Sequence, residues 1–162
     1  MNQIIFGQAE QDRVVYQERD EKTGFTVVMD TKWDEQSMDQ LYLVALCEDH
    51  SLHTLRDLTG DHVSLLTHIR NTTLKTISTK YHVSPDKILV YVHYLPSFMR
   101  FHIHFQHHLH SQASTPRSHM IDDVIDNLQR DGTYYQTASL SFLLKENHQI
   151  IQWMQDNSEQ PC

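Results

Sequence analysis

Two histidines, His102 and His104, stand two residues apart inside the apolar run VHYLPSFMRFHIHFQ. In a β-strand successive side chains point to opposite faces, so both imidazoles share one face while Phe101, Ile103 and Phe105 fill the other. At neutral pH histidine acts as a nucleophile, a proton carrier or a metal ligand. A histidine pair on a strand that is backed by core is therefore a candidate reaction centre.

Three interpretations of this pair stay open on the residues alone. In a chain with thirteen histidines, both can simply be packed in or beside the core. With a third histidine, such as His93, His108 or His110, the pair can form a three-imidazole site for zinc. The third interpretation is phosphoryl transfer, in which one imidazole attacks phosphorus to give a phosphohistidine.

Phosphoryl transfer also needs cations and hydrogen-bond donors that neutralise the remaining phosphate oxygens and hold the phosphate chain in line. The nearby candidates are His93 at the end of the preceding strand, Ser97 in the turn, Arg100, His104, and Arg117 at the start of the expected second helix. Backbone amides at a helix amino terminus favour anions, which adds to the case for Arg117.

The first half of the chain supplies a hairpin, a strand and a long helix. A charged turn, ERDEKTG, separates the β-prone segments Arg13–Tyr16 and Phe25–Asp30. The apolar run Leu41–Cys47 fits a buried strand or a short helix, and we favour the strand. Apolar residues at helical spacing between the start signal Thr59-Gly60-Asp61 and the stop signal Ser84-Pro85 predict one long amphipathic helix.

The second half is predicted to place the histidine pair in the middle of a sheet. Two strands, Ile88–Tyr94 and Phe101–His107, are joined through Leu95-Pro96-Ser97, where proline favours a turn. A second helix, a last strand and a short terminal helix follow, at His119–Leu128, Ser139–Leu144 and Asn147–Gln155. Mixed strands and helices without strict alternation indicate the α+β class.

Composition limits the class of protein. A chain of 162 residues with 39% hydrophobic and 21% charged residues fits one globular domain with a real core. The formal charge of -8 disfavours extensive electrostatic contact with duplex nucleic acid, because such contact needs many clustered lysines and arginines. A small phosphorylated ligand remains compatible with this charge.

Cysteine usage and the ends of the chain bear on the compartment. Cys47 lies in an apolar run and Cys162 is the last residue, so there is no sign of a disulfide framework, and a reducing compartment is favoured. No signal segment and no apolar stretch of membrane-spanning length stand out. We therefore expect a cytoplasmic and possible nuclear location and no membrane contact.

Several motifs, in the same order, resemble the carboxy-terminal half of the scavenger mRNA decapping enzymes, which are histidine triad hydrolases. They are DTKWDEQSMDQLYLVALC, SLHTLRDLT, VYVHYLPSFMRFHIHF and TYYQTASLSFLL. The resemblance runs from about Ile4 to about Trp153, and the family's amino-terminal domain has no counterpart in these 162 residues. It implies a single histidine triad domain, with a central antiparallel sheet, a long helix and shorter helices, that forms a homodimer through the sheet and the long helix.

The resemblance also implies a mechanism and a set of site residues. His102 matches the histidine that attacks the phosphate attached to 7-methylguanosine, and water then releases 7-methylguanosine monophosphate without a metal or another cofactor. His104 matches the last histidine of the triad, which binds and polarises phosphate oxygens. Residues that match substrate contacts are Glu10 at the guanine edge, Asp30 and Lys32 at the nucleoside and adjacent phosphate, and Tyr42, His93, Ser97 and Arg117 at the phosphates.

Four departures from the family pattern bear on activity and affinity. Arg100 replaces the first triad histidine, and we expect it beside the phosphates, where it neutralises charge. Phe98 replaces a tyrosine and so removes a hydroxyl, and Thr31 replaces an apolar residue that packs on the methylated base. The tryptophan that stacks on 7-methylguanine would fall just before Met1, and losing that stack costs roughly 1 to 3 kcal/mol of cap affinity.

We therefore predict hydrolysis of a 7-methylguanosine cap dinucleotide or very short capped RNA, with the cap nucleotide as the partner and no extended nucleic-acid binding. The alternatives are a cap or nucleotide binder without activity, a histidine triad hydrolase of other nucleoside polyphosphates, and a zinc site on His102 and His104.

Overall fold

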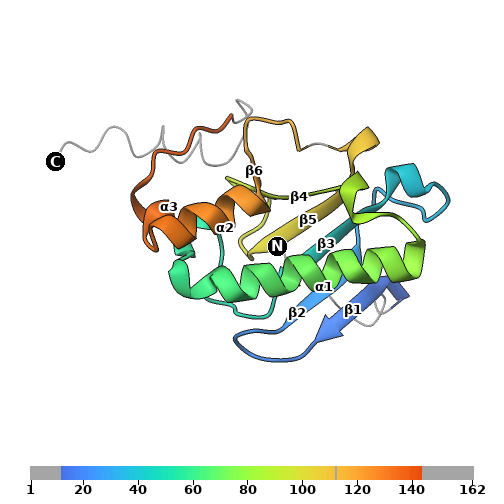
Figure 1. The fold of residues 1–162 in the computed structure, drawn as a ribbon, viewed down its shortest axis with the longest axis horizontal. Coiled ribbons are helices and arrows are strands. Elements are labelled where there is room, and N and C mark those ends of the chain that lie inside the picture. Colours follow the sequence, from blue (N-terminus) through green and yellow to red (C-terminus); the bar gives the residue numbers. More distant parts are fainter. Residues whose placement is uncertain (1–11, 112, 144–162) are drawn as a thin grey trace.

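Six strands form one antiparallel sheet in the order β1-β2-β3-β5-β4-β6. The computed structural model describes residues 12–111 and 113–143 (Figure 1). The strands are β1 Val14–Glu18, β2 Phe25–Met29, β3 Tyr42–Cys47, β4 Ile88–His93, β5 His102–His107 and β6 Ser118–Met120. Because β5 pairs with β3 on one side and β4 on the other, the prediction that the histidine-bearing strand is central is confirmed.

One long helix and several short ones accompany the sheet, which confirms the predicted α+β class. The helices are α1 Val63–Tyr81, α2 Ile121–Arg130 and α3 Tyr134–Thr137, with single 3₁₀ turns η2 Met38–Gln40, η3 Leu55–Asp57, η4 Gly60–His62, η5 Pro85–Lys87 and η6 His108–His110. Figure 1 shows α1 lying across one face of the sheet with α2 beside it. Within the described ranges, no helix is both long enough and apolar enough to cross a membrane.

The register between strands identifies the face that α1 covers. Val27 pairs with Ala45, and Ala45 pairs with Ile103, so these three side chains point the same way. Phe25 points the same way as Val27, because it lies two residues earlier on β2. Its ring meets His68 of α1 edge to face, with centroids 5.6 Å apart. Ile103 therefore belongs to the core between sheet and helix.

The two central histidines lie on the opposite face. His104 is directly across from Val44 of β3 and Tyr91 of β4, and His102 is across from Leu46. Both histidines are buried, with exposed fractions of 3% and 5%. The predicted alternation of histidine and apolar side chains along β5 is confirmed.

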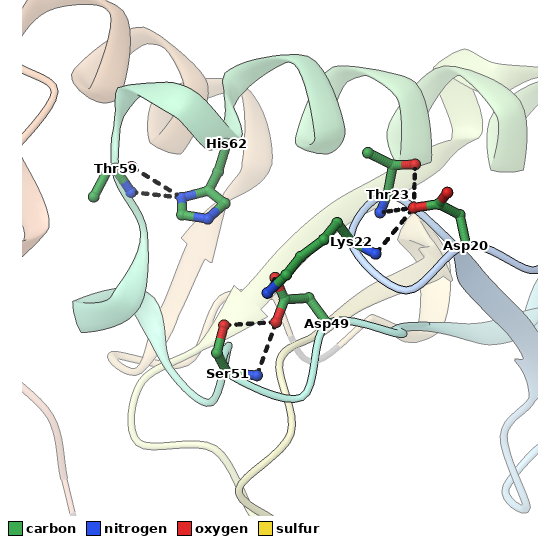
Figure 2. Close-up of polar contacts among 7 residues, drawn as sticks. All are labelled: Asp20, Lys22, Thr23, Asp49, Ser51, Thr59 and His62. Atoms are coloured by element: carbon green, nitrogen blue, oxygen red, sulfur yellow. Dashed lines mark hydrogen bonds and ion pairs between the residues drawn. The ribbon is translucent and has the colours of Figure 1, made fainter.

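A glycine closes the predicted turn between β1 and β2. The Gly24 amide donates to the Asp20 carbonyl at 3.0 Å, and a Cβ on Gly24 would lie 2.4 Å from backbone atoms of Asp20. The Asp20 carboxylate accepts hydrogen bonds from the backbone amides of Lys22 and Thr23 (Figure 2). Only glycine fits this close approach, so the hairpin geometry depends on it.

The predicted second helix starts later than His119. Residues 118–120 form β6, in which Met120 pairs with Tyr91 and Ser118 with His93. Pairing with β4 is a long-range contact, and it overrides the helical spacing of the apolar residues in this short segment. The helix itself begins at Ile121, the first residue of α2.

The predicted last strand, Ser139–Leu144, is wrong over its described part, residues 139–143. The Ala138 carbonyl, just before it, accepts from the Arg56 guanidinium at 2.6 Å, and Phe142 packs edge to face on Tyr94 with centroids 5.5 Å apart. Side-chain contacts, not a ladder, hold this segment. The predicted terminal helix, Asn147–Gln155, lies outside the described residues.

Candidate active site

A pocket of about 110 Å³ opens on the face of the sheet that bears the two central histidines. Its lining comes from the loop after β2, from β3, β4 and β5, from the loop between β4 and β5, and from the segment before β6. The lining residues are Asp30, Lys32, Tyr42, Val44, His93, Ser97, Phe98, His102, His104 and Arg117. Every residue predicted for the site is among them except Glu10, which lies outside the described residues, and Arg100.

The His102 ring is held at Nδ1 and on one face. Its Nδ1 lies 2.7 Å from the Arg100 carbonyl oxygen. Because a carbonyl oxygen can only accept a hydrogen bond, Nδ1 is the ring nitrogen that carries the proton. Phe98 stacks on the imidazole, with centroids 4.2 Å apart and an angle of 9° between the planes. Burial lowers the pKa of His102, so the ring stays neutral and Nε2 carries a free lone pair.

His104 is also held neutral. Its Nδ1 and the Tyr42 hydroxyl are 2.9 Å apart, and Tyr91 stacks on the ring with centroids 5.1 Å apart. Burial is the main cause that lowers the pKa of His104, to about 2. If Tyr42 donates to Nδ1, then Nε2 bears a proton that is available to a phosphate oxygen.

His93 completes a group of three neighbouring imidazoles. Its ring centroid lies 4.5 Å from that of His104, and burial lowers its pKa to about 4. Both ring nitrogens of His93 and the Nε2 atoms of His102 and His104 are buried without a hydrogen-bond partner in the described part of the chain. These nitrogens can therefore serve a bound ligand.

Two cations stand beside the histidines. Lys32 Nζ lies over the Tyr42 ring, 5.8 Å from its centroid, and its backbone amide donates to Asp30 Oδ1 at 2.9 Å. The Arg117 carbonyl accepts from the Tyr94 amide at 2.8 Å, which anchors the arginine beside the end of β4. The predicted placement of Arg117 at a helix amino terminus is wrong, because β6 separates it from α2.

Arg100 departs from its predicted place beside the phosphates. Its guanidinium donates to the Cys47 carbonyl at 2.9 Å and to Glu48 Oε2 at 3.1 Å, and it does not line the pocket. The backbone of Arg100, rather than its side chain, faces the reaction centre through the contact with His102.

Within residues 12–111 and 113–143, no group of three or more histidine, cysteine, aspartate or glutamate side chains has an arrangement that would hold a metal ion. In addition, the Nδ1 atoms of His102 and His104 contact a carbonyl and a hydroxyl. The arrangement offers a neutral nucleophile, neighbouring imidazoles and two cations, which together suit an attack on an anionic phosphate.

Comparison with known proteins identifies the family of this chain. Residues 1–119 match the family model described as "Scavenger mRNA decapping enzyme C-term binding". This chain belongs to the scavenger mRNA decapping enzyme family. The predicted resemblance is thereby confirmed, on a match that includes every residue lining the pocket.

Relatives in this decapping family share the name m7GpppX diphosphatase. The cattle protein is 37% identical over 155 residues, which is 94% of this chain and 46% of the relative. The human protein is 36% identical over 156 residues, with 94% and 46% covered, and the fission yeast protein is 33% identical over 152 residues, with 92% and 50% covered. The chain spans about half the length of these curated relatives.

Phe98, Val44 and Tyr91 are site residues that the sequence analysis did not predict. Phe98 was noted there only for the hydroxyl that it lacks relative to the decapping family. Its stack on His102 depends on how the loop between β4 and β5 folds back. Val44 and Tyr91 lie directly across from His104 on the neighbouring strands. The sequence places both residues in strands, but only the register between the strands shows that they face His104.

The lowered histidine pKa values predict that acid destabilises the fold. The pKa of His93 is lowered from 6.5 to about 4, and that of His104 to about 2. Below pH 6.5 the unfolded chain binds protons that the folded protein excludes. The free energy of unfolding therefore falls with decreasing pH, by up to about 1.4 kcal/mol per pH unit for each histidine. Urea denaturation at pH 7, 6, 5 and 4 measures this slope.

His104→Gln supplies the control for this slope. Glutamine does not titrate, so the variant should lose stability less steeply than the wild type between pH 6.5 and pH 4. Identical slopes for the two proteins would show that His104 is not held neutral by the fold.

Proposed function

We propose that this protein hydrolyses 7-methylguanosine cap dinucleotides or very short capped RNA, releasing 7-methylguanosine monophosphate through a phosphohistidine on His102. The observation that carries the proposal is the state of His102. Its Nδ1 proton is donated to the Arg100 carbonyl, and burial lowers its pKa. Its Nε2, which has no hydrogen-bond partner among the described residues, belongs to a pocket that Lys32 and Arg117 also line.

The first step transfers the 7-methylguanosine phosphoryl group to the protein. The Nε2 lone pair of His102 attacks the phosphorus attached to 7-methylguanosine. As the P–N bond forms, the bond from that phosphorus to the bridging oxygen of the next phosphate breaks. The electron pair leaves with that oxygen, as part of a nucleoside diphosphate or the rest of the RNA.

The second step regenerates the histidine. A water oxygen attacks the same phosphorus, the P–N bond breaks, and its electron pair returns to Nε2. The water proton passes to solvent, and 7-methylguanosine monophosphate leaves. The Arg100 carbonyl stabilises the cationic ring of the intermediate, because a hydrogen bond from a charged donor is stronger than one from a neutral donor.

The pocket supplies the charge compensation that both steps need. In the transition state negative charge spreads over the equatorial phosphate oxygens. Lys32 and Arg117 provide two positive charges, His104 and His93 provide ring nitrogens, and Ser97 provides a hydroxyl. Preorganised donors of this kind stabilise the transition state more than the same groups would in water.

A substrate panel tests the proposal. Incubation with m7GpppA in ¹⁸O-water should yield ADP and 7-methylguanosine monophosphate, with the label only in the monophosphate. Equal rates on m7GpppA, GpppA and ApppA would favour the alternative of a general nucleoside polyphosphate hydrolase. Binding of m7GpppA without any product would overturn hydrolysis and favour a cap-binding protein.

We also propose the homodimer and the cytoplasmic or nuclear location that the resemblance and composition imply. Sedimentation equilibrium of the purified protein gives a mass of twice 19.1 kDa if the dimer forms. A single species at 19.1 kDa at micromolar concentration would contradict it.

A further inference from the structure

The Arg100 side chain joins the residues before β5 to the end of β3. Its Nε donates to the Cys47 carbonyl at 2.9 Å, and its Nη2 donates to Glu48 Oε2 at 3.1 Å. The exposed fractions of the two side chains are 22% and 26%, so the ion pair is largely shielded from water. Because one guanidinium holds two acceptors on consecutive residues, the position of Arg100 is tightly defined.

Glu48 is itself held from the hairpin side. Its amide donates to the Gly24 carbonyl at 2.9 Å, and its other carboxylate oxygen accepts from the Thr26 hydroxyl at 2.8 Å. The next residue, Asp49, accepts from Lys22 Nζ at 3.0 Å and from the Ser51 hydroxyl at 2.5 Å (Figure 2). The segment that presents Glu48 is therefore anchored at several points.

The backbone of Arg100 holds the nucleophile. Its carbonyl accepts the Nδ1 proton of His102 at 2.7 Å, while its amide donates to the Phe98 carbonyl at 3.0 Å. The direction of that carbonyl decides where the imidazole plane lies and which nitrogen faces the pocket. The guanidinium contacts fix the same residue from the side-chain end.

We propose that the Arg100–Glu48 ion pair positions His102, by fixing the peptide carbonyl that selects its tautomer and orients its ring. This inference rests on the nucleophile role proposed for His102. Arg100 and Glu48 are positioning residues, since neither lines the pocket.

The charges around His102 agree with a positioning role for Arg100. The charged groups that act on its pKa are Arg117, which lowers it, and Asp30, which raises it, and both line the pocket. The Arg100 charge is offset by Glu48 at 3.1 Å. Arg100 therefore acts on the histidine through geometry, whereas Arg117 acts through charge.

Variants of the ion pair test the proposal. Arg100→Ala, Glu48→Ala and the double variant should each lower kcat for m7GpppA by about 10- to 100-fold, because small displacements of a nucleophile cost that much. KM should stay within about twofold of the wild-type value. The double variant should be no slower than the slower single variant, since both substitutions break the same ion pair. Arg100→Lys should be intermediate, because a single ammonium nitrogen keeps the charge but does not reproduce the two separate donor positions of the guanidinium.

Arg70→Ala is the matched control. Like Arg100, Arg70 pairs with a carboxylate, here that of Asp122, and its exposed fraction of 27% is close to that of Arg100. However, this pair joins α1 to α2 on the far side of the sheet from the pocket. The control should keep the wild-type kcat even if it lowers the melting temperature.

A second measurement does not require turnover. Histidine ¹⁵N NMR at pH 7 should show the Nδ1-protonated tautomer of His102 in the wild type and in Arg70→Ala, and a mixture of tautomers in Arg100→Ala and Glu48→Ala. An unchanged tautomer in both ion-pair variants would overturn the positioning role. If the wild type does not hydrolyse m7GpppA but the tautomer responds, the proposed function fails and the positioning role stands.

Kinetics distinguish the positioning role from direct binding of a substrate phosphate by Arg100. If Arg100 bound a substrate phosphate directly, Arg100→Ala would raise KM several-fold, and Glu48→Ala would leave kcat unchanged. That result would overturn the proposal.

Discussion

His102→Asn should abolish cap hydrolysis, with kcat for m7GpppA falling at least about 10⁴-fold, the scale seen when a nucleophile is removed from an enzyme. The asparagine amide retains a donor near the position of Nδ1, so the contact with the Arg100 carbonyl can persist. Only the nucleophilic nitrogen is lost. Steady-state product analysis by chromatography measures the change, and thermal melting verifies the fold.

His82→Asn is the matched control for this substitution. His82 ends α1 in a left-handed conformation with a φ of 56°, which asparagine readily adopts, and its side chain is exposed. This variant should retain full activity. A rate for His102→Asn within tenfold of wild type would remove His102 from the nucleophile role.

Trapping the intermediate gives a direct test of the same role. With ³²P in the phosphate attached to 7-methylguanosine, an alkaline quench within one turnover should leave label on the wild-type protein and none on His102→Asn. Phosphohistidine is labile in acid, so an acid quench should release the label. Label that survives acid on either protein would point to another nucleophile.

Arg117→Ala should produce the second-largest loss, with kcat/KM falling roughly 10²- to 10³-fold, the cost of removing one preorganised charge from a transition state. Arg117 lines the pocket, and its charge lowers the pKa of His93, His102 and His104. Its carbonyl, which accepts from Tyr94, remains after substitution. The fold should therefore persist while phosphate binding weakens.

The pH dependence of turnover provides an independent check on Arg117. The positive charge of this arginine helps to keep the His102 ring neutral. Its removal should raise the pKa of His102 and so shift the acid limb of the kcat/KM profile to higher pH. Arg130→Ala, which removes an exposed ion pair with Asp126 on α2, is the control and should leave the profile unchanged. A profile for Arg117→Ala that matches wild type in both height and position would contradict the assigned role.

The strands that form the site follow from local patterns. Period-two alternation at His102, Ile103 and His104 defines which side chains share a face of β5, because adjacent residues of any strand point opposite ways. Likewise, helical spacing from Val63 to Tyr81 and the stop before Pro85 locate α1 to within a few residues.

Segments with weak local patterns were not predictable in this way. Residues 119 and 120 lie within the predicted helix, yet they pair with β4. Residues 139–143 have strand-like composition, yet Arg56 binds the preceding carbonyl of Ala138 and no ladder forms. In both cases a partner distant in sequence decides the outcome, and that partner is invisible to a local pattern.

The sequence by itself indicated the central histidine strand and the α+β class, because alternation is a property of the chain. Motif order, through the family resemblance, indicated most of the residues that line the pocket, but not Val44 or Phe98. The tertiary structure alone decided the directions of side chains in the loop between β4 and β5. There Phe98 turns onto His102, and Arg100 turns away toward Glu48. No periodicity governs a loop, so contacts with β5 and with the end of β3 select these directions.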